Sequence, residues 1–303
     1  MAEEIKLHEI PLAGPITDRD QEISGMDWYN EILFLLPEND NGFLFTIAKD
    51  EIIKSINSSE QEPINPIKTS FNTNNISNRI NGFDGFEAIC FYNDIVYVTI
   101  EAEYEGLMYG YLIWGRISSD NYDINFPEEN FLKRETPVNL KNFSYESVLH
   151  YDSSIYMLYE ANGKKLQKDV KQIQVKGNFI FDVEFPNIEY RLTDATRVDS
   201  NNMFWCINYF WPGDKDILKP VINYQIEESK LSDSGVRLTA VERLIEFQIE
   251  GDNITLSGSK PINIALNRES PRNWEAIARL DNNGFLVATD KHPRMILGYL
   301  KYD

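Results

Sequence analysis

The chain has 303 residues, of which 42% are hydrophobic and 13% aromatic, which is ample for one large domain or two ordinary ones. Its formal net charge of −19 argues against nucleic acid or an anionic membrane surface as a partner, because both present negative charge. No apolar run approaches the roughly 18 residues of a membrane span. We expect a soluble monomer that binds a cation or a small polar molecule, and the sequence leaves both a cytoplasmic and an exported location open.

The first predicted element is a strand over residues 6–12, where apolar and polar side chains alternate. It precedes the first of five repeated units. The chain ends in a strand over residues 295–300, with no fourth strand after it. We therefore expect the N-terminal strand to complete the last unit, because this closes a ring and removes exposed sheet edges.

Each repeated unit begins with a hairpin of two short strands. In the second unit, Glu87 and Glu101 lie 14 residues apart, on either side of a turn at Asn93 and Asp94. In a hairpin, this symmetry places the two carboxylates side by side at the open end. The other units repeat the spacing, with one extra residue in the last: Ser24 and Glu38, Glu146 and Glu160, Asp194 and Asn208, Glu275 and Asp290. The first polar residue is always followed by a small one: Gly25, Ala88, Ser147, Ala195 and Ala276.

Further short strands follow each hairpin. Third strands are expected over 42–47, 109–117 and 170–175, and outer strands over 65–71, 183–190 and 254–266. Units of about four strands with almost no helical periodicity are typical of a propeller. The sequence therefore predicts an all-β fold, a five-bladed β-propeller that forms one domain over residues 1–303. A six-bladed ring, with part of residues 208–250 as an extra blade, is the alternative.

The fourth unit contains an insertion over residues 209–240, which begins with the aromatic residues Tyr209, Phe210 and Trp211. It joins the second strand of that unit to the third. Such a connection emerges at the same end of the propeller as the polar positions. We therefore expect the insertion to form a lid over an acidic mouth.

The first strand of each blade lines the axis of a propeller, so the first polar positions should gather around one mouth. Carboxylates crowded together raise one another's pKa unless a cation intervenes. Oxygen ligands suit Ca²⁺, or else Mg²⁺, whereas three histidines and two cysteines supply no zinc-type spacing. The predicted metal ligands are Glu87, Glu146, Asp194 and Glu275. The alternative is that nearby arginines and lysines pair with these carboxylates without a metal. These cations are Arg191, Arg197, Arg272, Arg279, Arg294 and Lys291.

The second polar positions should lie on the same rim and supply the chemistry. A carboxylate can act as a base, and a histidine titrates near neutral pH. The predicted catalytic residues are Glu101, Glu160, Asp290, His292 and Arg294. Aromatic rings beside polar groups suit a small polar ligand. The predicted substrate-binding residues are Glu38, Asn208, Tyr209 and Trp211.

Three blade starts share an aromatic–Glu–small–apolar pattern, at residues 86–89, 145–148 and 274–277. They resemble the blade starts of SMP-30/gluconolactonase-like and phytase-like propellers. This resemblance implies Ca²⁺ in the axial channel and hydrolysis of lactones or phosphate esters. The Glu-to-Glu hairpin in a five-unit chain is also similar to plant-type glutaminyl cyclases. Ser24 and Asn208 depart from the acidic pattern.

Two functional hypotheses follow. The first is a metal-assisted hydrolase or lyase, in which a pore carboxylate acts as a base on a small polar substrate beneath the lid. The second is a non-catalytic propeller that binds a ligand or a protein, with a structural ion or a salt-bridged pore. We favour the enzyme, although the sequence contains no diagnostic nucleophile.

Overall fold

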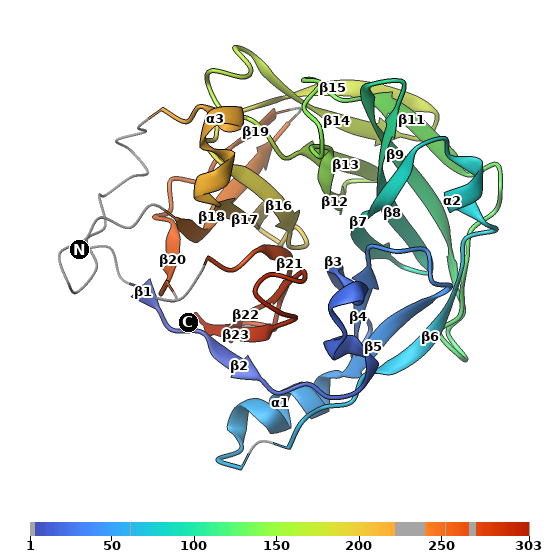
Figure 1. The fold of residues 1–303 in the computed structure, drawn as a ribbon, viewed down its shortest axis with the longest axis vertical. Helices are drawn as coiled ribbons and strands as arrows, with labels where there is room; N and C mark the ends of the chain where they lie inside the picture. Colours follow the sequence, from blue (N-terminus) through green and yellow to red (C-terminus); the bar gives the residue numbers. More distant parts are fainter. Residues whose placement is uncertain (1–3, 61, 222–239, 252, 267–270, 303) are drawn as a thin grey trace.

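The computed structural model describes residues 4–60, 62–221, 240–251, 253–266 and 271–302, and most of the elements in this part of the chain are β-strands (Figure 1). Each innermost strand contacts the next around the axis, and the last contacts the first. In order these strands are β3 (Ile23–Tyr29), β7 (Phe83–Tyr92), β12 (Tyr145–Tyr151), β16 (Arg191–Ala195) and β21 (Trp274–Arg279). Five inner strands in a closed ring confirm the five-bladed β-propeller, and the six-bladed alternative was wrong.

The remaining strands continue each blade outward. Blade 1 adds β4 (Ile32–Pro37), β5 (Phe43–Ala48) and β6 (Ile67–Asn72). Blade 2 adds β8 (Ile95–Tyr104), β9 (Leu107–Ile117), β10 (Ile124–Asn125) and β11 (Phe131–Glu135). Blade 3 adds β13 (Ser154–Tyr159), β14 (Val170–Lys176) and β15 (Phe179–Phe185). Blade 4 adds β17 (Met203–Phe210), β18 (Val241–Glu250), β19 (Asn253–Leu256) and β20 (Ile262–Ile264). Blade 5 adds β22 (Gly284–Thr289) and β23 (Leu297–Lys301).

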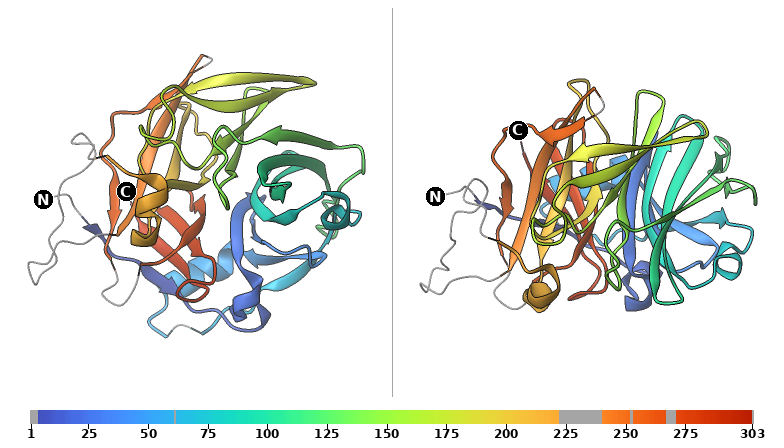
Figure 2. Two further views of the ribbon diagram at one scale, coloured as in Figure 1. Left: turned by 45° about the horizontal axis from the view of Figure 1, so that its top comes forward. Right: turned by 90° about the horizontal axis from the view of Figure 1, so that it is seen from above.

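The N-terminal segment closes the ring. Strand β2 (His8–Ile10) pairs antiparallel with β23, with His8 opposite Tyr299, so the predicted closure is confirmed. Just before it, β1 (Glu4–Ile5) pairs in parallel with β20 of blade 4. The same segment therefore links two neighbouring blades, as the two further views in Figure 2 also show.

Apolar side chains fill the spaces between neighbouring blades. The buried residues form five hydrophobic clusters, and most of these clusters combine strands of adjacent blades. One contains Phe34 of β4, Phe86 of β7 and Val98 of β8, all fully buried. Both faces of a blade are therefore covered by neighbours. This burial explains why the strands are nearly continuous in Val, Ile, Leu and Phe.

Short helices connect some of the strands: η1 (Pro15–Thr17), η2 (Arg19–Gln21), α1 (Lys49–Asn57), α2 (Ile76–Arg79), η3 (Pro212–Asp214) and α3 (Lys215–Leu218). The sequence did not predict α1, because only Ile52 and Ser55 of its nine residues are buried and the apolar periodicity is correspondingly weak. Two predicted outer strands also differ. β15 forms a tight hairpin with β14 and ends at Phe185, and the strand expected over 254–266 is divided into β19 and β20.

The first polar position of each repeat lies at a β-bulge of the inner strand. In blade 2, Glu87 and Ala88 together lie opposite the single residue Thr99. The register shifts at the equivalent place in the other four blades, around Ser24, Glu146, Asp194 and Glu275. A bulge bends its strand and redirects side chains. The five bulges, and not simple alternation, therefore determine where these polar groups point.

The small residue after each polar position reflects close approach of the inner strands. A Cβ atom added to Gly25 would lie 3.0 Å from Ala88 Cα and 3.1 Å from both Glu87 O and Ile89 N. These neighbours are backbone atoms and cannot move aside without displacing a strand. The repeated small residues are therefore a packing requirement of the ring.

We expect Gly25→Ala to lower the free energy of unfolding by about 1–3 kcal/mol, the usual cost of overpacking. A suitable control is Ser147→Ala at the equivalent position of blade 3. The Ser147 hydroxyl is buried and has no hydrogen-bond partner among the described residues, so its loss should change stability by less than about 0.5 kcal/mol. Urea unfolding followed by circular dichroism measures both. Equal midpoints for the two variants would contradict this account of the small residues.

Candidate functional site

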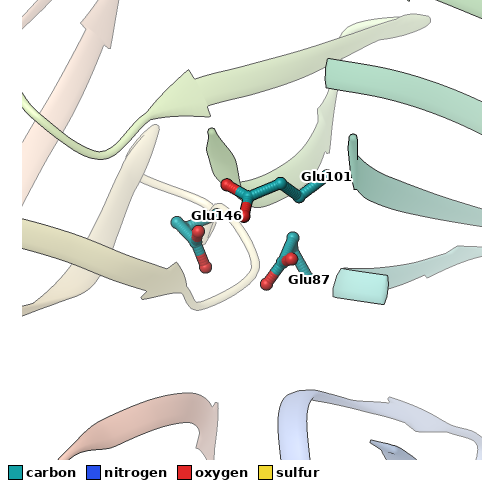
Figure 3. A group of neighbouring side chains, drawn as sticks. All are labelled: Glu87, Glu101 and Glu146. Atoms are coloured by element: carbon teal, nitrogen blue, oxygen red, sulfur yellow. The ribbon is translucent and has the colours of Figure 1, made fainter. Parts of the chain in front are cut away.

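Three carboxylates meet at one end of the axis. Glu87 of β7, Glu101 of β8 and Glu146 of β12 offer oxygens that all lie within 4.8 Å of one another (Figure 3). The hairpin spacing brings Glu101 beside Glu87. The contact between β7 and β12 adds Glu146 from the next blade. We refer to these three residues as the inner carboxylates.

The inner carboxylates lack a compensating cation in contact with them among the described residues. Burial, followed by repulsion from Glu160 and Asp84, raises the pKa of Glu101 to about 8. Burial and neighbouring carboxylates also raise the pKa values of Glu87 and Glu146 well above the usual range. Glu101 is only 4% exposed, and its Oε2 accepts no hydrogen bond from the described residues. An oxygen left unpartnered beside two other carboxylates fits a hard divalent cation.

Arg191 supplies the positive charge beside the inner carboxylates. Its Nη1 donates to Glu160 at 3.0 Å, its Nε donates to Asp214 at 2.9 Å, and its guanidinium lies 4.0 Å from the ring centre of Phe143. Burial raises the pKa of Glu160, and Arg191 limits the rise to about 6. Of the cations proposed in the salt-bridge alternative, Arg191 and Lys291 reach this mouth. The others pair elsewhere: Arg197 with Asp27, Arg272 with Glu242, Arg279 with Asp199, and Arg294 with Glu9.

A second group of carboxyls, which we call the outer carboxyls, comprises Glu38, Glu275 and Asp290. All three are partly exposed, in contrast to the inner carboxylates. They come from blades 1 and 5. Burial and the charges of Asp290, Glu160 and Glu38 raise the pKa of Glu275 well above its usual range, and Arg191 partly opposes the rise. The outer carboxyls therefore interact electrostatically and remain within reach of solvent.

Glu38 and Glu22 form a carboxyl pair with Lys291. Burial and the hydrogen bond with Glu22 raise the pKa of Glu38 to about 9. Burial opposes ionisation of Glu22, but hydrogen bonds with Glu38 and Lys291 lower its pKa overall. Lys291 Nζ lies 2.8 Å from Glu22 Oε1. At neutral pH the shared proton therefore belongs to Glu38, and Glu22 is the carboxylate.

Asp290 accepts two hydrogen bonds that favour its charged form. The side-chain amide of Asn273 donates to its Oδ2 at 2.8 Å, and the backbone N–H of His292 donates to its Oδ1 at 2.6 Å. Burial raises the pKa of Asp290, while these two donors favour the charged form. One mouth thus contains a carboxyl whose pKa is raised to about 9 and a second carboxyl that accepts two hydrogen bonds.

Two predicted polar residues are engaged with backbone or with another side chain. Asp194 is buried and accepts 2.8 Å hydrogen bonds from the backbone N–H groups of Ala195 and of Ile277 in blade 5. Burial raises its pKa well above the usual range, and the two N–H donors oppose the rise. Asn208 donates to Glu189 O and Arg191 O and accepts from Arg243 Nε at 2.8 Å. The structure therefore does not bring Asp194 or Asn208 into contact with the inner carboxylates.

The remaining predicted residues differ in their exposure and in their contacts. Tyr209 is buried opposite Arg191, and burial followed by Glu275 raises its pKa. Trp211 is 52% exposed, and its ring lies directly over Gly213. His292 is exposed next to Asp290, whereas Arg294 pairs with Glu9 of the N-terminal segment at 2.7 Å. Residues 222–239 of the predicted lid lie outside the described residues.

Sequence reasoning missed Glu22 and Asp214 as members of the site. Both lie outside the repeated hairpins, so no spacing pointed to them. Asp214 follows Trp211 in η3, at the start of the insertion, and it contacts Arg191. The sequence did offer one signal for these two residues, namely an acidic side chain close to a repeated hairpin. Glu22 directly precedes the first strand of blade 1, and Asp214 follows the second strand of blade 4.

No family model matches the chain, and no curated protein matches it. An α-L-arabinanase mutant from Cellvibrio cellulosa superposes with a TM-score of 0.50 at 9% identity, over 93% of this chain and 92% of the arabinanase. A protein from the GH130 family, described as mannoside phosphorylases and glycoside hydrolases that target β-1,2 mannosidic linkages, gives 0.53 at 8% identity, over 98% and 94%. At such identities the likeness shows the propeller fold alone. These structures do not support the SMP-30-like or phytase-like types in particular.

None of the described helices combines the length and the apolar character that crossing a bilayer requires. The longest, α1, has nine residues.

Proposed function

We propose that the protein is a hydrolase that cleaves a glycosidic bond in a carbohydrate at the acidic mouth. The observation that carries the proposal is a pair of partly exposed carboxyls in unlike environments: the pKa of Glu38 is raised to about 9, and Asp290 accepts two hydrogen bonds that favour its charged form. Glycoside hydrolysis needs one carboxyl that donates a proton and one carboxylate that activates water or attacks. The two propellers compared above process glycosides. That likeness supports the substrate class by analogy only.

Glu38 acts as the general acid in this proposal. Its proton is retained at pH 7 because Lys291 stabilises the negative charge on Glu22 instead. Asp290 acts as the base, since the amide of Asn273 and the N–H of His292 favour its charged form and fix its orientation.

Three further predicted residues have distinct places in this proposal: one can bind a sugar, and two take no part. Trp211 supplies an exposed aromatic face on which a sugar ring can stack. Arg294 is not involved in this scheme, because it pairs with Glu9 of the N-terminal segment. The buried Asp194 is not involved either, because its carboxylate serves the contact between blades 4 and 5.

The inner carboxylates form the proposed cation site, with Ca²⁺ as the first choice and Mg²⁺ as the second. Glu87, Glu101 and Glu146 would hold the ion, and the unpartnered Oε2 of Glu101 is the observation that favours it. The ion would supply positive charge that keeps three crowded carboxylates ionised. The acid and base roles of Glu38 and Asp290 do not depend on it.

The proposal is tested by incubating the purified protein with arabino-oligosaccharides and β-1,2-linked manno-oligosaccharides, with Ca²⁺ present. New reducing ends should appear, and their rate should fall when Trp211 is replaced by Ala, through a higher KM. Binding of these sugars without cleavage would overturn the enzyme and favour the second candidate, a ligand-binding propeller. The ligand-binding candidate is favoured by the burial of two predicted catalytic residues, because Glu101 and Glu160 are only 4% and 0% exposed.

A further inference from the structure

A separate cavity opens at the other end of the inner strands, among the turns that join first and second strands. Its volume is about 430 Å³. It is lined by Tyr29, Asn30, Phe91, Asn93, Asp94 and Arg197. These residues come from the turns of blades 1 and 2 and from the loop after β16. None of them belongs to the acidic mouth.

Arg197 is fixed at this cavity by a buried partner. Its Nε and Nη2 donate to the two oxygens of Asp27 at 2.8 and 2.9 Å. Asp27 is itself held by the backbone N–H groups of Trp28 and Phe91 at 2.8 and 2.7 Å. The Arg197 side chain is nevertheless 46% exposed, and its Nη1 has no partner among the described residues. The guanidinium is therefore a rigid donor with one edge available to a ligand.

The lining also contains a carboxylate with a fixed orientation, Asp94. The hydroxyl of Tyr29 donates to Asp94 Oδ1 at 2.7 Å, and this bond raises the pKa of Tyr29 to about 12. The other oxygen of Asp94 accepts no hydrogen bond from the described residues, and Asp94 is exposed. The exposed Asn30 and Asn93, both with positive φ in tight turns, add amide groups that donate and accept. The lining thus supplies both hydrogen-bond donors and acceptors.

The charges narrow the class of ligand. The lining contains one cation, Arg197, and one carboxylate, Asp94, and the buried Asp27 already pairs with Arg197. An anion such as phosphate or a uronic acid would therefore meet net negative charge. The lining is mostly polar, which disfavours an apolar ligand. A ligand with adjacent hydroxyl groups, each both donor and acceptor, could form hydrogen bonds with the guanidinium edge, the carboxylate and the two amides of this lining. Next to Asn93, the ring of Tyr92 is 42% exposed and stacks on His150 at 3.4 Å, which adds a flat aromatic surface.

We propose that this cavity binds a unit of a neutral saccharide, at a site distinct from the acidic mouth. The volume fits a small ligand. The inference goes beyond hydrolysis and does not depend on it, because the cavity shares no residue with Glu38, Asp290 or the inner carboxylates. A bound saccharide chain would be held at one end of the propeller whether or not the other end cleaves it.

The test is saturation-transfer NMR of D-mannose and L-arabinose with the intact protein, titrated to millimolar concentration. Asp94→Asn keeps an acceptor for Tyr29 but removes the charge, and Asn93→Ala removes an amide. Each should weaken binding of at least one sugar by fivefold or more. Asp152→Asn makes the same chemical change in the equivalent exposed turn of blade 3, outside the cavity, and should leave the affinity unchanged.

The results separate this site from the acidic mouth. Binding that Asp94→Asn and Asn93→Ala leave intact would overturn the proposal, as would no binding of either sugar. A parallel titration with inorganic phosphate, followed by the phosphorus line width, should show no binding. Phosphate binding that strengthens in Asp94→Asn would also overturn the neutral-saccharide assignment, because it would identify an anion site around Arg197.

Discussion

Glu38→Gln and Asp290→Asn should each reduce the kcat of glycoside hydrolysis by roughly 10²–10⁴-fold, the usual contribution of a general acid or base. Glu38→Gln removes the proton donor, and Asp290→Asn removes the base while keeping the size of the side chain. Both effects should appear in kcat more than in KM, because the proton transfers occur in the transition state. The measurement is steady-state kinetics on whichever oligosaccharide the wild-type protein cleaves.

The pH profile adds a second readout. Glu38 must be protonated to act, and its pKa is raised to about 9, so activity should fall as the pH rises through 9. The loss at low pH should begin above the ordinary range of an aspartate, since burial raises the pKa of Asp290. Glu103→Gln is the matched control. Glu103 lies on β8 and pairs with Lys141 at 3.1 Å, outside the carboxyl clusters. Similar activities for Glu38→Gln, Glu103→Gln and wild type would remove Glu38 from the mechanism.

The second large effect concerns stability and cations. Protein treated with EDTA should lose stability as the pH rises from about 5 to 8 and should recover it when Ca²⁺ is added at pH 8. The folded pKa of Glu101 is raised from 4.5 to about 8. The stabilising contribution of a carboxyl with a raised pKa is complete below its unfolded pKa and is lost as the pH rises through its folded pKa. At about 1.4 kcal/mol per pKa unit, the loss should be on the order of a few kcal/mol.

A cation reverses this loss because it binds the deprotonated carboxylates. At 100 times its dissociation constant, it should add about 2.7 kcal/mol to the free energy of unfolding. Glu101→Gln should abolish the Ca²⁺ response and make the EDTA-treated protein more stable than wild type at pH 8. Glu103→Gln, on the same strand, should retain the response. Thermal unfolding at pH 5 and pH 8, with Ca²⁺ or Mg²⁺, provides the measurement. An unchanged melting temperature on adding either ion would exclude the cation site.

The hairpin repeat was sufficient to predict the ring and part of the site. The 14-residue spacing correctly predicted that Glu101 would lie near Glu87, and the neighbouring blade start contributed Glu146. The unpaired strand at the C-terminus correctly predicted closure by the N-terminal strand. These features depend on local spacing or on the repeat, so they can be recognised in a single sequence.

The contacts of the other site residues depend on three-dimensional geometry, which the spacing of residues in the sequence does not reveal. The bulges set the direction of each polar side chain, and at blade 4 the carboxylate of Asp194 bonds to the backbone of blade 5. Asn208 occupies the matching position on β17 but bonds to Arg243. The protonation of Glu38 depends on Glu22 and Lys291, which are 269 residues apart in the chain. Contacts of this range follow only from the closed ring.

The most direct test of the account is hydrolysis in water enriched in heavy oxygen, with the products analysed by mass spectrometry. The protein would be incubated with arabino- or manno-oligosaccharides and Ca²⁺. A glycoside hydrolase transfers one oxygen from water to the new reducing end, so that product should carry the label, and Glu38→Gln should form little of it. Unlabelled, unsaturated products would indicate a lyase, and intact oligosaccharides would indicate a binding protein. Either result would contradict the proposed hydrolase.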